Sequence, residues 1–139
     1  MALSQNIEVK TLNKGYTVTR KSTGTDVFYK GALVNTVQTT GKIVVAADTS
    51  THMFCGYVEE YVSAVADTVV KIRKSDVAWF YNSGAALTDL DKPVWATADD
   101  TLTITPATNV LPCGQIVDVD LTNKYWLVDF SKGQMRDIT

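Results

Sequence analysis

The sequence predicts an all-β protein: a single compact β-sandwich or barrel with at most one or two short helical turns. Two observations lead to this prediction. Short runs rich in Val, Thr and aromatic residues recur at intervals of roughly 8–12 residues, the spacing typical of antiparallel sandwiches and barrels. Turn residues separate the runs, where an α/β fold would need helical stretches. The 139 residues suffice for one domain, which we place at residues 15–130, with an extended N-terminal arm at 1–14 and a C-terminal tail at 131–139.

Alternating or β-branched runs predict the strands of the N-terminal half. The run at 53–58 contains Gly56, which we interpret as a bulge or a point of close backbone approach. Residues 59–66 have weak helical character but are too few for a stable isolated helix. The predicted strands are 16–20, 27–29, 32–37, 42–45, 53–58 and 68–73.

The alternation is clearest in the second half of the chain. In the run at 101–105, Leu102 and Ile104 face the core while the intervening threonines face solvent. Residues 88–90 are expected to form one helical turn capped by Thr88, before Pro93 opens a strand. The predicted strands are 77–81, 93–97, 101–105, 114–120 and 125–129.

Charge and hydropathy exclude several classes of partner. The formal net charge is -2 and the basic residues are scattered, so the chain lacks the basic face that nucleic-acid binding requires. Apolar runs are far shorter than the roughly 20 residues of a membrane helix. The N-terminus has neither the basic nor the apolar region of a secretory signal. We therefore expect no nucleic-acid partner and no membrane partner.

The residues that could support catalysis or metal binding do not form a convincing set. His52 is the only histidine and lies near Cys55, but no third group orients the pair, so we interpret it as a surface-loop histidine. One histidine and two distant cysteines do not make a closed zinc site. We expect no enzyme activity, no cofactor and no metal. Both Cys55 and Cys113 are expected to be free thiols, with Cys55 buried.

Two acidic pairs have ordinary structural explanations. Asp118 and Asp120 share one face of a predicted strand, which we take as its solvated face, with Val117 and Val119 on the opposite side. The pair at 99–100 lies between two strands and is typical of a turn. A bound cation is the alternative interpretation of either pair.

Aromatic residues are more numerous than one small core readily holds. The three rings at 79–81 are consecutive, so they cannot all face the same core, and residues 125–126 place two rings on opposite faces. The outward rings are either ordinary half-exposed aromatics, part of an interface with a partner, or a sugar-binding platform. We take Trp79, Trp95 and Trp126 as the candidate interface residues.

Motifs in matching order along nearly the whole chain resemble the small capsid decoration (cement) proteins of tailed bacteriophages. They are VFYKGALV at 27–34, FCGYVEE at 54–60, KIRKSDVAWFYNS at 71–83, LTDLDKPVW at 87–95, ADDTLT at 98–103, GQIVDVD at 114–120 and WLVD at 126–129. The chain departs from the family pattern at Asp76 and Asp91, where glycine is common, and at Trp95, where tyrosine is usual. These departures concern local turn shapes.

The resemblance implies a β-tulip-like knob, often trimeric, that docks on the outer surface of an assembled head and stabilises it. It implies the major capsid protein and other copies of this chain as partners, synthesis in the host cytoplasm and a final location in the virion. It implies no catalytic residues. Carbohydrate binding, or a role as the base of a head fibre, is the alternative function, and a head–tail or tail component is a third.

The N-terminal arm is the predicted contact with the capsid. Ile7 and Val9 alternate with Glu8 and Lys10, a pattern that suits addition as a strand to an exposed sheet edge of a coat subunit.

Overall fold

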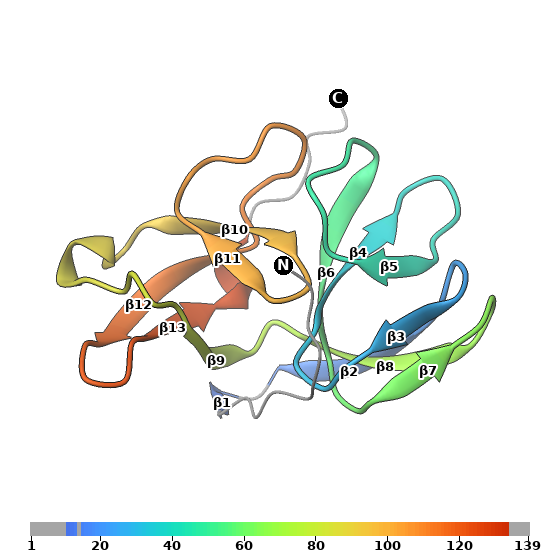
Figure 1. Ribbon diagram of the computed structural model, residues 1–139, viewed down its shortest axis with the longest axis horizontal. Coiled ribbons are helices and arrows are strands. Elements are labelled where there is room, and N and C mark those ends of the chain that lie inside the picture. Colours follow the sequence, from blue (N-terminus) through green and yellow to red (C-terminus); the bar gives the residue numbers. More distant parts are fainter. Residues whose placement is uncertain (1–10, 14, 134–139) are drawn as a thin grey trace.

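The computed structural model describes residues 11–13 and 15–133, which form three antiparallel sheets and two short 3-10 turns (Figure 1). The six-stranded sheet has the order β1-β9-β13-β12-β10-β11, the five-stranded sheet β2-β8-β6-β4-β5, and β3 pairs with β7. The strands are β1 Thr11–Asn13, β2 Tyr16–Lys21, β3 Asp26–Phe28, β4 Leu33–Val37, β5 Ile43–Val45, β6 His52–Val58, β7 Val62–Ala64, β8 Val69–Lys74, β9 Val77–Tyr81, β10 Pro93–Ala98, β11 Thr101–Thr103, β12 Gly114–Asp120 and β13 Tyr125–Asp129.

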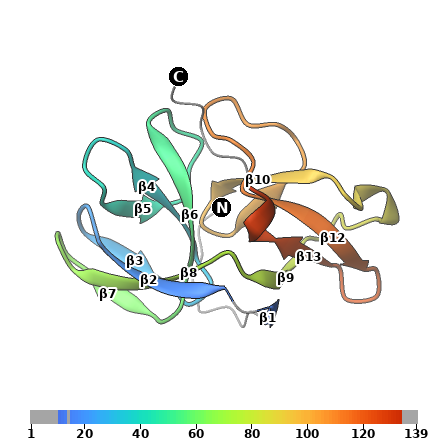
Figure 2. The ribbon, with the colours of Figure 1, turned by 180° about the vertical axis from the view of Figure 1, so that it is seen from behind.

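The all-β prediction is confirmed, and the sheets remain open at their edges rather than closing into a barrel. Two lobes lie side by side, one holding the six-stranded sheet and the other the five-stranded sheet with β3 and β7 (Figure 2). Each lobe has its own apolar cluster. Residues from β8, β4 and β3 fill the cluster of the five-stranded lobe, including Phe28, Val34 and Ile72.

The second cluster joins the two lobes. It contains the inward side chains of the six-stranded sheet, and also Leu33 and Tyr57 from the five-stranded sheet. Four rings meet at this seam: the Phe54 and Phe130 rings stack with centroids 5.4 Å apart, while Phe80 makes edge contacts with Tyr57 and with Phe130. Because the seam is apolar and aromatic, burial there holds the lobes together as one body.

Gly56 lies at a close backbone approach, as the sequence predicts. A Cβ atom on this residue would lie 2.1 Å from the carbonyl oxygen of Arg73 on the neighbouring strand β8. The register of the β4–β6 pair also shifts beside it, since Val34 pairs with Gly56 and Asn35 with Phe54, which leaves Cys55 as the bulged residue.

The helical turns differ in detail from the prediction. The turn η1 spans Leu87–Asp89, and its N-terminal cap is Ala86, so the assignment of Thr88 as the cap is wrong. The Asp89 carboxylate accepts a 2.9 Å hydrogen bond from the Ala86 backbone N–H, which closes the turn from its other end. The second turn, η2, spans Phe130–Lys132. Among the described residues, no helix has the length and apolar character needed to cross a membrane.

A bulge in β12 changes which side chains face outward. The register against β13 shifts between Ile116 and Asp118, so Val117 is an extra residue and is 38% exposed. The prediction that Val117 faces inward is therefore wrong, whereas Val119 does pack against the core. Simple alternation fails here because a bulge inserts one residue into the period of two.

The first strand begins within the segment that the sequence assigns to the arm. Thr11–Asn13 form β1 and pair antiparallel with β9 at an edge of the six-stranded sheet. The proposed capsid-contact residues, Ile7 and Val9, lie outside the described residues.

Candidate interaction face and the polar cluster that supports it

One side of the six-stranded sheet carries a group of large apolar side chains that we call the aromatic face: Trp79, Tyr81, Tyr125 and Leu127. The strand register sets their grouping, because Tyr81 pairs with Tyr125 and Trp79 with Leu127. Their sequence neighbours Phe80 and Trp126 form a cross-strand pair on the opposite, core side. The consecutive rings at 79–81 thus divide between the two sides of the sheet, as predicted.

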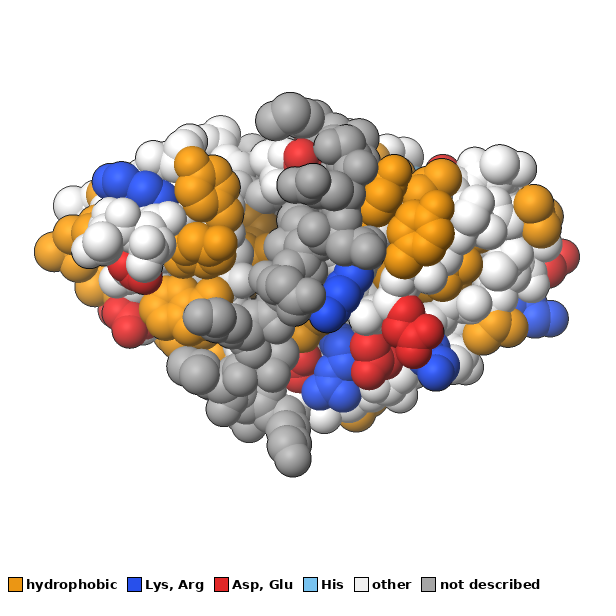
Figure 3. Space-filling model, turned by 60° about the horizontal axis from the view of Figure 1, so that its bottom comes forward, with side chains coloured by type: hydrophobic (Ala, Val, Ile, Leu, Met, Phe, Trp, Pro, Cys, Tyr) orange, Lys and Arg blue, Asp and Glu red, His pale blue; other side chains and the backbone are white. Residues whose placement is uncertain are grey.

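The aromatic face is partly open to solvent. Tyr81 is 63% exposed, and its ring meets that of Tyr125 edge-on with centroids 5.8 Å apart. Trp79 is partly exposed, whereas Leu127 beside it is buried. Figure 3 shows hydrophobic side chains exposed over both halves of the molecule, including the left half. Exposed rings that are held by a neighbour are typical anchors of protein interfaces.

The three predicted interface tryptophans have different positions. Trp79 belongs to the aromatic face. Trp95 is partly exposed and lies on the same side of the sheet. The paired residues Pro93, Gln115, Asp129 and Val77 form one row across the sheet, at the end away from Tyr81 and Tyr125. Trp95 lies beyond this row, so it is at the opposite end of the sheet from the Tyr81–Tyr125 pair. Trp126 is 3% exposed and lies in the core, so its assignment to an interface is wrong.

The position of Trp126 is fixed by a buried polar contact. Its ring Nε1–H donates a 3.0 Å hydrogen bond to the carboxylate of Asp89, which is itself buried. The same carboxylate oxygen accepts the bond that closes η1. Sequence alternation shows that Tyr125 and Trp126 face opposite ways, but the identity of the inward ring depends on pairing with β9, which is a long-range contact.

Carboxylates border the aromatic face on strand β12. Asp118 pairs with Leu127 and Asp120 with Tyr125, so both acidic side chains lie on the same side of the sheet as the rings. The pKa of Asp120 is lowered chiefly by hydrogen bonds from the backbone and side chain of Asn123, which outweigh the opposing desolvation, and the Thr122 backbone adds a smaller contribution. The face therefore suits a partner that brings apolar side chains together with basic ones.

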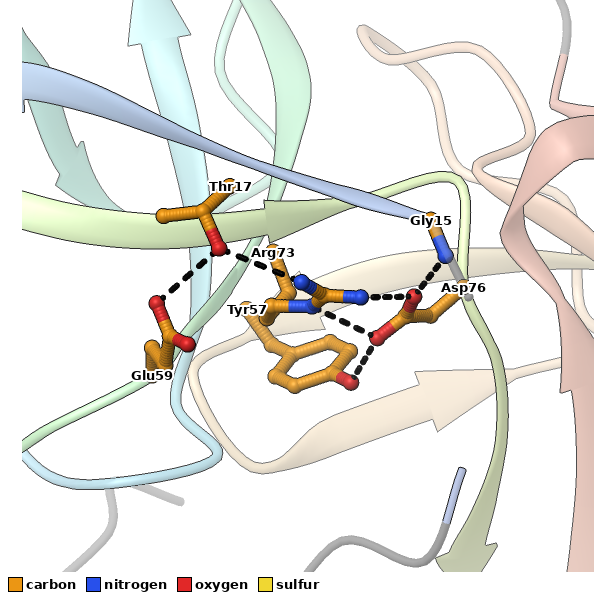
Figure 4. Close-up of polar contacts among 6 residues, drawn as sticks. All are labelled: Gly15, Thr17, Tyr57, Glu59, Arg73 and Asp76. Carbon is orange, nitrogen blue, oxygen red and sulfur yellow. Dashed lines mark hydrogen bonds and ion pairs between the residues drawn. The ribbon is translucent and has the colours of Figure 1, made fainter. Parts of the chain in front are cut away.

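A buried polar cluster connects the two lobes behind this face and consists of Gly15, Tyr57, Arg73 and Asp76 (Figure 4). Asp76 lies in the link between β8 and β9, and its side chain is 0% exposed. Arg73 donates to it twice, from Nε to Oδ2 at 3.0 Å and from a terminal guanidinium nitrogen to Oδ1 at 2.8 Å. The Tyr57 hydroxyl and the Gly15 backbone N–H donate the remaining bonds.

The cluster fixes the ionisation of its members. Burial acts to raise the pKa of Asp76, but the bonds from Arg73, Tyr57 and Gly15 outweigh it and hold the pKa below its ordinary value. Burial, together with the neighbouring Asp76 carboxylate, raises the pKa of the Tyr57 hydroxyl. At neutral pH the cluster is therefore an ionised carboxylate held by a cation and neutral donors.

The cluster extends to the surface through Thr17. Arg73 donates a 3.1 Å bond to the Thr17 hydroxyl, which in turn donates a 3.1 Å bond to Glu59. Tyr57, Arg73 and Thr17 belong to the five-stranded sheet, while Asp76 immediately precedes β9 of the six-stranded sheet. The cluster thus fixes the angle at which the chain passes from one lobe to the other. The sequence analysis singles out Asp76 only as a departure from a motif in which glycine is common, and gives no sign of these contacts.

The structure describes the positions of the histidine and the two cysteines that the sequence analysis weighs for catalysis and metal binding. His52 is the first residue of β6 and its ring Nδ1 is buried, so its interpretation as a surface-loop residue is wrong. Cys55 and Cys113 are both buried and free, as predicted. Burial raises the pKa of the Cys113 thiol to about 12, which suppresses the reactive thiolate. The described residues contain no group of His, Cys, Asp or Glu arranged to hold a metal ion.

Comparisons with protein-family models, with curated proteins and with solved structures find no match for this chain.

Proposed function

We propose that this protein is a capsid decoration (cement) protein of a tailed bacteriophage, which binds the outside of the assembled head as a homotrimer and stabilises it. The observation that carries the proposal is the aromatic face: solvent-exposed rings on a sheet that a second lobe and a buried polar cluster support. A rigid protein with such an exposed face can bind other copies of itself or another protein.

The aromatic face serves self-association in this proposal. Tyr and Trp side chains supply large contact areas with little loss of conformational entropy, and such residues dominate the energetics of protein interfaces. A trimer then presents three identical coat-binding elements at a site where several coat subunits meet. Linking weak contacts in this way raises the overall affinity by about 100-fold or more.

The N-terminal segment serves contact with the major capsid protein. Its chain enters the described fold at β1, on an edge of the six-stranded sheet. The alternation at Ile7 and Val9 suits strand addition to a coat subunit, where backbone hydrogen bonds give affinity and alternate side chains give specificity.

Binding to undecorated heads tests both parts of the proposal. The heads would be those of the phage that carries this gene, assembled without this protein, and occupancy would be measured by co-sedimentation. We expect Tyr81→Arg to lower the apparent affinity by about 100-fold because the avidity of the trimer is lost. Tyr61→Arg, at a residue that is 49% exposed and lies outside the aromatic face, is the matched control.

Deleting residues 2–10 tests the arm while leaving β1 intact. Occupancy should fall although the oligomeric state of the free protein is unchanged. Full occupancy of both the deletion variant and Tyr81→Arg would contradict the proposal, as would the failure of the unaltered protein to bind any heads.

Carbohydrate binding is the second candidate, and one observation favours it. The Tyr81–Tyr125 pair lies beside the carboxylates of Asp118 and Asp120, and aromatic rings with adjacent polar groups are the composition of a sugar-binding surface. Glycan-array binding that is lost in Tyr81→Arg, together with no affinity for heads, would select this function instead.

A further inference from the structure

A cavity of about 370 Å³ lies at the seam between the lobes, away from the aromatic face. One wall comes from β2, β6 and the end of β8, and includes Phe54, Cys55 and Lys74. The other wall comes from residues 111–113 and the turn after β13, and includes Cys113 and Phe130. The volume is at the small end of the range in which proteins bind small molecules.

The second wall is held tightly in place. A Cβ atom on Gly133 would lie 2.8 Å from the Cys113 carbonyl oxygen, so this backbone packs directly against residues 112–113. The Cys113 N–H in turn donates a 2.8 Å bond to the Val94 carbonyl. The cavity is therefore bounded by fixed backbone and by the stacked rings of Phe54 and Phe130, which makes it a preformed site.

Among the described lining residues, Lys74 is the one lysine or arginine, and polar and apolar groups share the walls. Lys74 continues the series of β8 residues that face inward, after Val70 and Ile72, which are both 0% exposed. Its ammonium group donates a 2.9 Å bond to the Cys55 carbonyl and a weak 4.0 Å bond to the Cys55 sulfur, which leaves one of its three donors for a ligand. The ion pairs formed among the described residues do not include Lys74.

A second polar group in the wall lacks a partner. The Nδ1 atom of His52 is buried and has no hydrogen-bond partner among the described residues. Buried polar atoms in native proteins are nearly always paired with protein, water or a ligand. The His52 nitrogen is closed off from the open space of the cavity, so the Lys74 ammonium is the group there that calls for a polar ligand.

We propose that this cavity binds a small apolar carboxylate, a compact aromatic or short aliphatic acid. Its carboxylate accepts charge-assisted hydrogen bonds from Lys74, while its hydrocarbon body packs against Phe54, Met53 and Phe130. None of the residues named for this site belongs to the aromatic face, so the proposal stands whether or not the protein decorates a capsid.

Titration with benzoate and hexanoate, each paired with its neutral amide, tests the ligand class. Calorimetry should show saturable binding of the acids with dissociation constants on the order of 0.1–1 mM, and at least tenfold weaker binding of the amides. Chemical-shift changes in the NMR spectrum should include the Met53 methyl group. An absence of saturation by both acids, or equal affinity for acids and amides, would overturn the proposal.

Three substitutions in β8 test whether Lys74 supplies the positive charge that binds the acids. Lys74→Met should weaken binding of the acids by roughly 10- to 100-fold, because a charge-assisted bond is removed, and Lys74→Arg should retain most of it. Lys71→Met is the control, since Lys71 belongs to the same strand but pairs with the exposed Glu60 at 3.3 Å. Unchanged binding in a Lys74→Met protein that unfolds at the normal temperature would also overturn the proposal.

A filling variant tests the cavity without altering its charge. Leu111→Trp at the wall should abolish binding of benzoate by occupying the space, whereas Leu121→Trp, in the turn between β12 and β13, should not. Equal binding to both variants would place the ligand elsewhere.

Discussion

Arg73 holds the buried carboxylate of Asp76 through two hydrogen bonds, at 3.0 Å and 2.8 Å, at the point where the chain passes from one lobe to the other. Neither residue is isolated, because Tyr57 and Gly15 donate to the same carboxylate. The pair therefore joins three segments of the chain at one fully buried group.

Removing the charge of Asp76 should destabilise the fold strongly. In Asp76→Asn, the NH2 of the new amide is itself a donor and faces donor groups of Arg73, Tyr57 and Gly15, so buried hydrogen bonds are lost. Arg73 also loses its counter-charge. We expect the free energy of unfolding in urea to fall by about 3 kcal/mol. The control is Asp67→Asn, which breaks the exposed 2.7 Å ion pair with Lys42 and should leave the free energy of unfolding nearly unchanged. Equal effects of the two substitutions would show that the cluster is not a stabilising element.

Stability should depend on pH with a plateau around neutrality. The pKa of Asp76 is lowered in the fold, so its contribution is present above its ordinary value of 3.8 and is lost as pH falls through the folded value. The pKa values of Tyr57 and Cys113 are raised, Cys113 from 9.0 to about 12, so their contributions are present below pH 9.0 and are lost at higher pH. Urea denaturation across pH 2–11 should show both losses.

Two variants test which residue causes the loss of stability at alkaline pH and which causes the loss at acid pH. Tyr57→Phe should flatten part of the alkaline loss because the ionisable hydroxyl is gone, and Asp76→Asn should flatten part of the acid loss. If either variant keeps the full slope on its own side, the assignment of that side is wrong.

The strands themselves could be predicted from local sequence. The runs at 77–81, 114–120 and 125–129 match β9, β12 and β13 residue for residue, because Val, Thr and aromatic side chains favour extended backbone and turn residues delimit them. Gly56 was also recognisable, since a glycine inside a strand pattern commonly marks a close approach. Local propensity was therefore sufficient for these strands, but it missed β1 and also β7, which lies in the segment at 59–66 that the sequence analysis gives weak helical character and which forms by pairing with β3.

Features that depend on pairing between distant segments could not be predicted in this way. The inward position of Trp126 and the outward position of Val117 follow from the register of β13 against β9 and from the bulge in β12. The bonds from Tyr57 and Gly15 to Asp76 cross 19 and 61 positions of the chain. The cavity at Lys74 likewise requires the two lobes to be in place, so the sequence pattern alone does not reveal it.

Adding a methyl group at Gly56 should disrupt the contact between β6 and β8. The Cβ atom of Gly56→Ala would lie 2.1 Å from the Arg73 carbonyl oxygen, and that oxygen is backbone, so the strands must separate. We expect a loss of about 3 kcal/mol in the free energy of unfolding. In Gly24→Ala the new atom meets nothing within 4 Å, and the change should stay within about 0.5 kcal/mol. A Gly56→Ala protein as stable as Gly24→Ala would refute the close approach.

Self-association through the aromatic face should be visible in the free protein. Sedimentation should show a species heavier than the 15.2 kDa chain, because the partly exposed rings of Trp79 and Tyr81 gain burial only against another molecule. Tyr81→Arg places a charge at the centre of that contact and should shift the distribution toward 15.2 kDa, while Tyr61→Arg should leave it unchanged. An unaltered protein that sediments as a monomer at high concentration would contradict the role of this face in trimer formation. If Tyr61→Arg dissociated the oligomer as much as Tyr81→Arg did, the effect would not be specific to the aromatic face, and this face would lose its assignment as the contact.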